Sequence, residues 1–346
     1  MTRIGVNALY LIPGGVGGTE IYLRSLLAAL AEIDSNNEYW IFTNRETGRD
    51  LVPNQPNFHW KPQPVHAINR PRRLLWEQTG LAWAARGLDV LFNPGFTMPA
   101  FCPCPSVTVF HDLQHKRFPQ YFRWFDLPFW NFFLGIAVKR SRKLIAVSDA
   151  TRQDLRRFYG VDATVIHHGV DPAFFAMQAN RSAEDYILCV STLHPHKNLE
   201  RLLRVYASTP DLPDLVIAGM KGFAAKRIEA LACDRVRVTG WIPREELYRL
   251  FQGARAFVYP SSFEGFGIPV LEAMAAGIPV ACSDIPPLRE VAGDTVIYFD
   301  PGNDAAMASA LRQVVGDSSR VNAARARAAE FSWEKCARET LAALTG

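Results

Sequence analysis

Two glutamates, eight positions apart, enclose a glycine-rich turn in the segment Glu264-Gly265-Phe266-Gly267-Ile268-Pro269-Val270-Leu271-Glu272. Gly265 and Gly267 remove side chains where a backbone must approach a partner or take unusual dihedral angles, and Pro269 suits the first turn of a helix. Such a turn presents amide groups and the positive end of a helix dipole, which together favour an anion. The carboxylates can accept hydrogen bonds from sugar or ribose hydroxyls. The segment therefore predicts a site for a ligand that carries both phosphate and hydroxyl groups.

Other residues of the chain could complete such a site, and each also has an ordinary structural interpretation. Lys197 precedes an amphipathic segment and could neutralise phosphate, or could be a solvated charge. His111, followed by Asp112, ends an apolar strand, where it could act on a ligand or have no role. Gly17 and Gly18 could bring backbone close to phosphate, or could only make a tight strand-to-helix turn.

The elements that must position these residues alternate between short β-branched runs and longer helical patterns, which is typical of parallel α/β sheets. The expected strands are Arg3–Ala8, Tyr39–Thr43, Asp89–Asn93, Ser106–Phe110, Lys143–Ser148, Thr164–His167, Tyr186–Ser191, Leu215–Ala218, Val236–Gly240, Ala256–Tyr259, Ile278–Cys282 and Val296–Phe299. The pattern restarts after the stretch Asp171–Asp185, which is rich in Ala, Asn, Ser and acidic residues. We therefore expect an α/β fold of two doubly wound parallel-sheet domains, residues 1–172 and 173–330, with a final helix in 331–346 that caps the second domain or crosses back to the first.

Composition and charge exclude several classes of protein. The 346 residues are 49% hydrophobic and 21% charged, with a net charge of +4, which is the balance of a soluble protein with sizeable cores and gives no reason to expect a nucleic-acid partner. No run approaches a membrane span, and no signal sequence precedes the first strand. Six cysteines are too few for a disulfide framework, so we expect a reduced, cytoplasmic protein. No cluster has metal-ligand spacing, so we expect no metal.

The chemistry-bearing segments, taken together, resemble the retaining glycosyltransferases of family four, also called glycosyl transferases group 1, which have the GT-B fold. The glutamate pair is similar to the E-x7-E element of that family. Five more segments resemble family elements in family order: Gly14-Gly15-Val16-Gly17-Gly18-Thr19-Glu20, His111-Asp112, Val147-Ser148, Ile166-His167-His168-Gly169-Val170-Asp171 and Ser191-Thr192-Leu193-His194-Pro195-His196-Lys197-Asn198. One such match is weak, but six in order indicate membership.

The resemblance implies two Rossmann-like domains facing across a cleft, with the nucleotide-sugar donor mainly on the second domain and the acceptor on the first. Glu272 would hold the ribose hydroxyls, and Glu264 would hold the sugar hydroxyls. His111 would lie beside the reacting carbon. The remaining donor contacts implied by the resemblance are Gly17, Gly18, Lys197, the backbone of Gly265, Phe266 and Gly267, and the amides near Val270 and Leu271. The reaction would be a metal-free, front-face displacement that keeps the anomeric configuration, in which the protein contributes positioning and charge stabilisation.

One departure from the family pattern concerns the segment Ser191–Asn198, which resembles the family's phosphate segment and is called the phosphate segment below. Thr192 stands where the family usually has arginine, which leaves Lys197 as the obvious cation for two phosphate charges. His194 and His196 could add charge if protonated, and helix-terminal amides could supply the rest. Thr192 and His196 are therefore possible members of the phosphate segment.

Donor and acceptor are less specified by the sequence. The forms "VFHDLQHKRFP" and "TLHPHKN", with Trp76-Glu77-Gln78 upstream, resemble bacterial polysaccharide mannosyltransferases, which implies GDP-mannose as donor, while UDP-glucose and related UDP-sugars stay open. A surface polysaccharide or lipid-linked oligosaccharide is the implied acceptor. The aromatic segment Phe118–Phe133 predicts either a helix in the first core, which we favour, or a surface for membrane lipid or a lipid-linked substrate. The Arg70–Arg73 cluster is a second place to look for the acceptor.

Three other functions compete with transfer. A non-catalytic nucleotide-sugar-binding relative would not need the groups around the reacting carbon. A sugar-nucleotide epimerase or a phosphorylase of the same fold has different motifs. An NAD-dependent oxidoreductase would need a third glycine at position 20, where Glu20 stands, and an acidic residue after the second strand, where Thr43-Asn44 stands.

Overall fold

The computed structural model describes residues 1–15, 17–177 and 185–346 of the chain. Val16 of the glycine loop lies outside the described residues, and so do residues 178–184 of the expected domain boundary at Asp171–Asp185. The described chain divides into two compact units: residues 1–169 with 333–346, and residues 170–332.

The first unit is built on a seven-stranded parallel sheet in the order β3-β2-β1-β4-β5-β6-β7. Its strands are β1 (Arg3–Asn7), β2 (Glu38–Thr43), β3 (Phe58–Pro62), β4 (Val90–Asn93), β5 (Ser106–Phe110), β6 (Lys143–Ala146) and β7 (Thr164–Val165). Its helices are α1 (Gly18–Ile33), α2 (Arg70–Trp76), the π-helix Glu77–Leu81, α3 (Ala82–Ala84), α4 (Gln114–Arg117), α5 (Leu127–Arg140), α6 (Asp149–Tyr159) and α15 (Trp333–Thr345). The strand order reverses between β1 and β4, and ligands of such sheets bind at this topological switch point.

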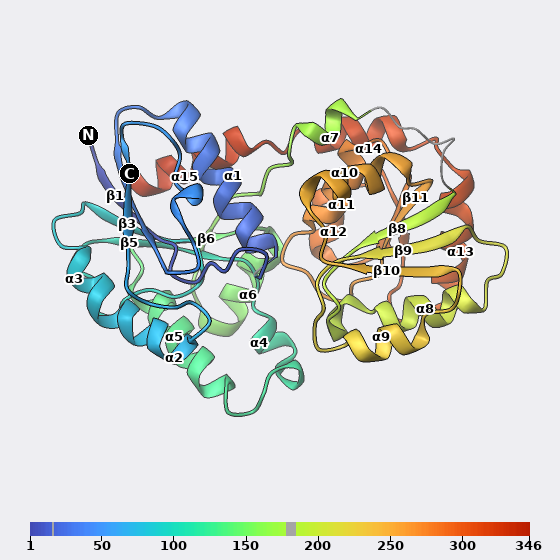
Figure 1. Cartoon of the computed structure of the whole chain (residues 1–346), viewed down its shortest axis with the longest axis horizontal. Coiled ribbons are helices and arrows are strands. Elements are labelled where there is room, and N and C mark those ends of the chain that lie inside the picture. The colour runs from blue at the N-terminus through green and yellow to red at the C-terminus, as the bar shows by residue number, and fades with distance from the viewer. Residues whose placement is uncertain (16, 178–184) are drawn as a thin grey trace. The chain divides into compact units, whose positions relative to one another are not determined.

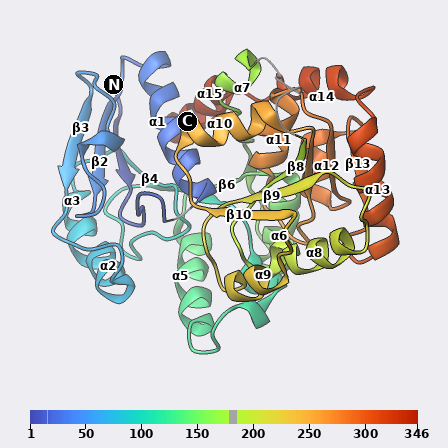
Figure 2. The ribbon, with the colours of Figure 1, turned by 45° about the vertical axis from the view of Figure 1, so that its right-hand side comes forward.

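The last helix belongs to this first unit. In both views α15 runs beside α1 (Figure 1, Figure 2), and the two helices are in contact. Trp333 at the start of α15 lies against the Tyr22 ring at 6.2 Å between centroids, and Arg142 donates a 2.9 Å hydrogen bond to the carbonyl of Leu344. The first unit is thus assembled from both ends of the described chain.

The second unit is built on a six-stranded parallel sheet in the order β10-β9-β8-β11-β12-β13. Its strands are β8 (Tyr186–Val190), β9 (Asp214–Ala218), β10 (Val236–Gly240), β11 (Ala256–Tyr259), β12 (Val280–Ser283) and β13 (Ile297–Phe299). Its helices are α7 (Ala173–Ala176), α8 (Leu199–Ala207), α9 (Ala225–Leu231), α10 (Arg244–Gly253), α11 (Ile268–Ala275), α12 (Pro286–Ala292), α13 (Asp304–Gly316) and α14 (Val321–Ala328). Here the order reverses between β8 and β11.

Both sheets carry helices on each face, as the second unit shows clearly in Figure 1. Burial on both faces explains the apolar strands, since a parallel sheet must be covered twice. In the second unit the sheet packs with α8, α9 and α13 through a core of Leu, Ile and Val side chains. The expected fold of two doubly wound parallel-sheet domains is confirmed.

Two expectations about the first unit were wrong in detail. The edge strand β3 was not expected, because its polar His59 and Lys61 and its terminal Pro62 hide the apolar pattern of a strand. The aromatic segment Phe118–Phe133 is not a core helix either. Trp124 is 82% exposed and Phe132 is 62% exposed.

Candidate active site

The strongest ion pair among the expected site residues joins the two strands at the switch point of the second sheet. Lys197 follows β8 and Glu264 follows β11, and Lys197 Nζ lies 2.6 Å from Glu264 Oε1. The same Nζ lies 3.2 Å from the hydroxyl oxygen of Tyr259, the last residue of β11. Because the carboxyl ends of parallel strands share one edge of the sheet, residues 67 positions apart meet there.

This pair is largely withdrawn from solvent. The side chains of Lys197 and Glu264 are 13% and 11% exposed. Burial by itself raises the pKa of Glu264, but the ammonium of Lys197 and a hydrogen bond from Ser261 outweigh it and hold the pKa below the usual value. Glu264 is therefore ionised at neutral pH and can accept hydrogen bonds from hydroxyl groups.

The loop that carries Lys197 is fastened to the loop after β11 through one carbonyl group. The carbonyl oxygen of His196 accepts from the backbone amide of Ser262 at 2.8 Å and from its hydroxyl at 2.9 Å. Burial, followed by the nearby Lys197, lowers the pKa of the His196 ring to about 3, and burial also lowers the pKa of His194. Both rings are neutral at pH 7, so the added positive charge considered for these histidines is not available.

The glycine turn before α11 has the geometry that only glycine tolerates. Gly267 caps α11 with φ +118°, and a Cβ atom there would lie 2.5 Å from Cδ2 of Leu288. The amides of Val270 and Leu271 donate to the carbonyl oxygen of Gly267 at 3.1 and 3.2 Å. A phosphate at this helix end therefore meets the dipole of α11, while these two amides already have an acceptor.

Glu272 lies inside α11 and is buried, with 3% of the residue exposed. Its Oε1 is 3.1 Å from Nη1 of Arg244, and Nη2 of the same arginine is 3.1 Å from Asp171 Oδ2. Tyr248 also donates to Asp171. Burial raises the pKa of Glu272 to about 6 in spite of Arg244. The second glutamate of the pair therefore titrates just below neutral pH.

Sequence reasoning missed Arg244 and Tyr248. Both belong to α10, and their spacing of four residues places them on one helix face. In the sequence they look like ordinary exposed positions of a charged helix. The only available signal was indirect: a glutamate in an apolar helix needs a buried cation.

In the first unit, His111 follows β5 and is buried. Its Nε2 lies 2.7 Å from the carbonyl oxygen of Pro94. Burial lowers the pKa of His111 to about 4, so the ring is neutral. Because a carbonyl only accepts, the proton is on Nε2, and Nδ1 is left as an acceptor. The ring also stacks on His168, at 5.6 Å between centroids and 15° between planes.

The N-terminal glycine loop is held by an acidic side chain of α1. Glu20 accepts a 2.7 Å hydrogen bond from the amide of Gly14 and pairs with Arg24 at 2.8 Å. Gly17 has φ +57° and Gly18 begins α1. The positive φ accounts for glycine at position 17 as a turn requirement, and phosphate contact at these two residues stays a prediction.

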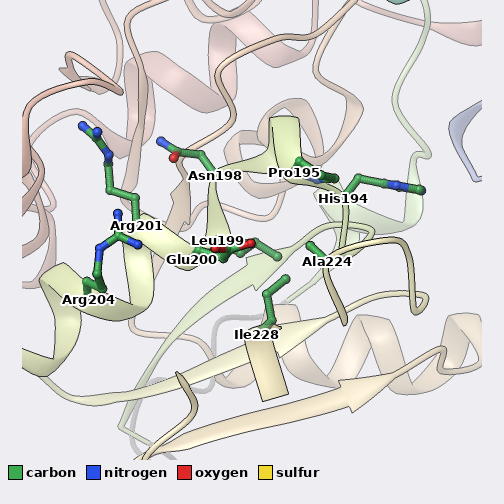
Figure 3. A pocket seen from close by; sticks show the side chains of 9 residues that line it. All are labelled: His194, Pro195, Asn198, Leu199, Glu200, Arg201, Arg204, Ala224 and Ile228. Atoms are coloured by element: carbon green, nitrogen blue, oxygen red, sulfur yellow. The ribbon is translucent and has the colours of Figure 1, made fainter. Parts of the chain in front are cut away.

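A cavity of about 250 Å³ is lined in part by His194, Pro195 and Asn198 of the phosphate segment. Figure 3 shows His194 and Asn198 beside it, Arg204 of α8 at one end and Ile228 of α9 below. Lys197, Glu264 and Glu272 are not among its lining residues. The cavity is therefore separate from the site formed by these three residues, although residues of the phosphate segment contribute to both.

Comparisons with known proteins identify the family of the chain. The model of the family described as glycosyl transferases group 1 matches residues 171–331, and the glycosyltransferase family 4 model matches residues 16–174. The O-antigen chain mannosyltransferase B of Escherichia coli is 32% identical over 289 residues, covering 75% of each chain. The O-antigen chain mannosyltransferase RfbU of Salmonella typhimurium is 30% identical over 217 residues, covering 60% of each.

The fold itself matches solved structures over its whole length. Sucrose-phosphate synthase from Thermosynechococcus elongatus superposes with a TM-score of 0.82 at 21% identity, covering 99% of this chain and 98% of that one. At this identity the likeness shows the shared architecture of two Rossmann-like units.

Proposed function

The chain belongs to the glycosyl transferases group 1 family, and on that basis we propose that it transfers mannose from GDP-mannose to a hydroxyl of a saccharide acceptor with retention of anomeric configuration. The observation that carries the proposal is the Lys197–Glu264 pair, largely shielded from solvent, beside the N-terminus of α11. It places a cation, an ionised carboxylate and a helix dipole at one sheet edge, which matches a ligand made of phosphates and sugar hydroxyls.

Mannose as the transferred sugar is supported by the relatives, two of which are named O-antigen chain mannosyltransferases. Those names concern polymers of surface saccharide, which supports a growing polysaccharide or lipid-linked oligosaccharide as acceptor. A UDP-sugar is the competing donor.

In the proposed reaction the bond between the anomeric carbon and the phosphate oxygen breaks, and its electron pair leaves with the phosphate. The acceptor hydroxyl attacks from the same face, and its proton passes to the departing phosphate. Glu264 would hold sugar hydroxyls, Glu272 the ribose hydroxyls, and Lys197 would stabilise the phosphate charge. His111 Nδ1 would accept a hydrogen bond from the sugar, because its Nε2 is already engaged by Pro94.

The test is a thermal-shift panel with GDP, UDP, ADP, GDP-mannose, UDP-glucose and NAD, each with and without EDTA. A ligand at 100 times its Kd stabilises the folded chain by about 2.7 kcal/mol, a shift of roughly 4 to 8 °C. Shifts with GDP and GDP-mannose that EDTA does not change would support the proposal, including metal independence. Shifts with NAD alone would favour an oxidoreductase. Donor binding without any product from acceptor or water would favour a non-catalytic relative.

Membrane contact is a further part of the proposal, supported by the exposed aromatic segment at residues 118–133. Trp124, Phe125 and Phe132 are exposed, and the stretch from Lys116 to Arg140 has five Lys or Arg against one Asp. Exposed aromatic rings with flanking cations suit an anionic bilayer surface. No helix in the described ranges is long and apolar enough to cross a membrane. Co-sedimentation with phosphatidylglycerol vesicles, lost in Trp124→Ser with Phe132→Ser, would support it, and unchanged sedimentation would contradict it.

A further inference from the structure

A cluster of buried polar side chains occupies the switch point of the first sheet, the place that corresponds to the Lys197–Glu264 pair in the second. Asn7 ends β1 and Asn93 ends β4, and Asn7 Nδ2 donates to Asn93 Oδ1 at 3.1 Å. Asn7 Nδ2 also lies 3.3 Å from Oε2 of Glu77. All three residues are at most 2% exposed. The cluster thus joins the two strands where ligands of doubly wound sheets bind.

The π-helix between residues 77 and 81 supplies the carboxylate of this cluster. Glu77 accepts from the hydroxyl of Thr97 at 2.9 Å, and the next residue, Gln78, binds the backbone of Met98 and Ala100. Single π-turns occur often at functional sites. These contacts fix the loop after β4, whose Pro94 carbonyl holds His111.

Arg73 stands one turn before Glu77 and is the cation of the cluster. The residue is 8% exposed, and its Nε has no hydrogen-bond partner among the residues that the structure describes. Its guanidinium lies close enough to Glu77 and Tyr10 for electrostatic interaction, yet no ion pair within 4 Å joins Arg73 to Glu77. A buried guanidinium Nε group that lacks a hydrogen bond is costly, and native proteins rarely keep one without a purpose.

We propose that Arg73, together with Glu77, binds neighbouring hydroxyl groups of the acceptor saccharide at the carboxyl edge of the first sheet. This inference rests on the proposed transfer of a sugar to a saccharide. The planar fork of the guanidinium can donate to two adjacent oxygens, and the Glu77 carboxylate can accept from a hydroxyl.

An uncharged sugar fits this pair better than an anion does. Arg73 and Glu77 together carry no net charge, and a phosphate or carboxylate bound to Arg73 would lie near the Glu77 carboxylate. Hydroxyl groups both donate and accept, so they can satisfy both members of the pair.

The test compares Arg73→Met with Arg86→Met. Arg86 is exposed and lies outside the Arg70–Arg73 cluster, so it controls for loss of one positive charge. Three quantities are measured for each: the rate of transfer from GDP-mannose to mannobiose, the rate of GDP-mannose hydrolysis by water, and the Tm. Saturation-transfer NMR with mannobiose, and separately with glucuronate and with inorganic phosphate, reports binding directly.

We expect Arg73→Met to raise the KM for mannobiose by about 10- to 100-fold, the loss of a charge-assisted hydrogen bond. Hydrolysis and the thermal shift with GDP-mannose should not change, while Tm itself should fall, because the buried Glu77 carboxylate loses its neighbouring cation. Arg86→Met should match the wild type in all three.

Other results would overturn the inference. A lower Tm with an unchanged KM would make Arg73 a structural residue. If glucuronate or phosphate binds in an Arg73-dependent way and mannobiose does not, the ligand of Arg73 is an anion and not an uncharged sugar. Failure of the proposed function can be told apart from failure of this inference. If the proposed function is wrong, no donor raises the Tm of the wild type and the wild type hydrolyses none. In that case the NMR comparison decides alone, and mannobiose that fails to bind the wild type rejects the inference.

Discussion

At the scale of single residues, the candidate site depends on charges that are buried in pairs. Lys197 and Glu264 neutralise each other at 2.6 Å, with both side chains at most 13% exposed. Removal of one partner leaves an uncompensated charge with little water around it, which is more harmful than removal of both.

We therefore expect Lys197→Met to lower the free energy of unfolding by about 3 kcal/mol and to abolish transfer. The double variant Lys197→Met with Glu264→Gln should recover much of the stability but none of the activity. Urea unfolding of the two single variants and the double variant measures the coupling. Strictly additive losses would show that the pair does not interact energetically.

The raised pKa of Glu272, about 6, predicts a pH-dependent donor affinity. The side chain accepts more strongly from ribose hydroxyls when it is ionised, so protonation below pH 6 should weaken binding of GDP-mannose by up to about tenfold at pH 5 relative to pH 7. Because the pKa is raised in the folded state, this group's contribution to stability is lost as pH rises through about 6, the opposite direction to its effect on binding. Titration calorimetry between pH 5 and pH 8 measures the affinity. Glu272→Gln should bind weakly at every pH, and a pH dependence that persists in this variant would assign it elsewhere.

His111 should act on turnover rather than on binding. We expect His111→Ala to keep the GDP-mannose affinity and to lower kcat by about 10- to 100-fold, since one hydrogen bond to the reacting sugar is lost. With a pKa of about 4, the neutral ring should cause no fall in kcat between pH 8 and pH 5.5. Equal losses of affinity in His111→Ala and Glu272→Ala would make His111 a structural member of the donor pocket.

At the scale of elements, the turn into α11 shows how backbone geometry limits the site. Gly267→Ala would force an alanine to φ +118° with its Cβ 2.5 Å from Leu288. We expect a loss of about 1 to 3 kcal/mol in stability and weaker donor binding, because the helix end must move. Gly316→Ala is the matched control, since a Cβ there meets no atom within 4 Å and the residue ends α13. A Gly267→Ala protein as stable as this control would mean that the turn relaxes freely.

The elements also show which parts of the structure could be predicted from the sequence. Lys197, Glu264 and His111 each follow an apolar run that predicted a strand, and parallel strands bring their carboxyl ends to one edge, so these positions could be foreseen. Arg244 could not, because its partner Glu272 is 28 residues away and their contact depends on how α10 packs against α11. The exposed rings of 118–133 were misassigned because aromatic content alone does not tell a core from a binding surface.

At the scale of the whole molecule, α15 joins the first unit although it follows the second unit in the sequence. Trp333 is 8% exposed and lies against Tyr22 and His168. Trp333→Ala should lower the free energy of unfolding of the first unit by about 3 to 5 kcal/mol, the usual loss for a buried Trp. Urea unfolding followed by circular dichroism measures it. Glu334→Ala, on the exposed face of the same helix, should be neutral, and equal losses would point to helix propensity instead of packing.

The placement of α15 also determines when the first unit can complete its folding during synthesis. Strands β1 to β7 emerge from the ribosome before the second unit, but the helix that covers α1 is translated only after the whole second unit. At 5 to 20 residues per second, a ribosome needs roughly 20 to 70 seconds for these 346 residues. For most of that time the α1 surface around Tyr22 has no cover, so the first unit is completed only after the second has been made. Nascent chains therefore have a long interval in which a chaperone can hold them.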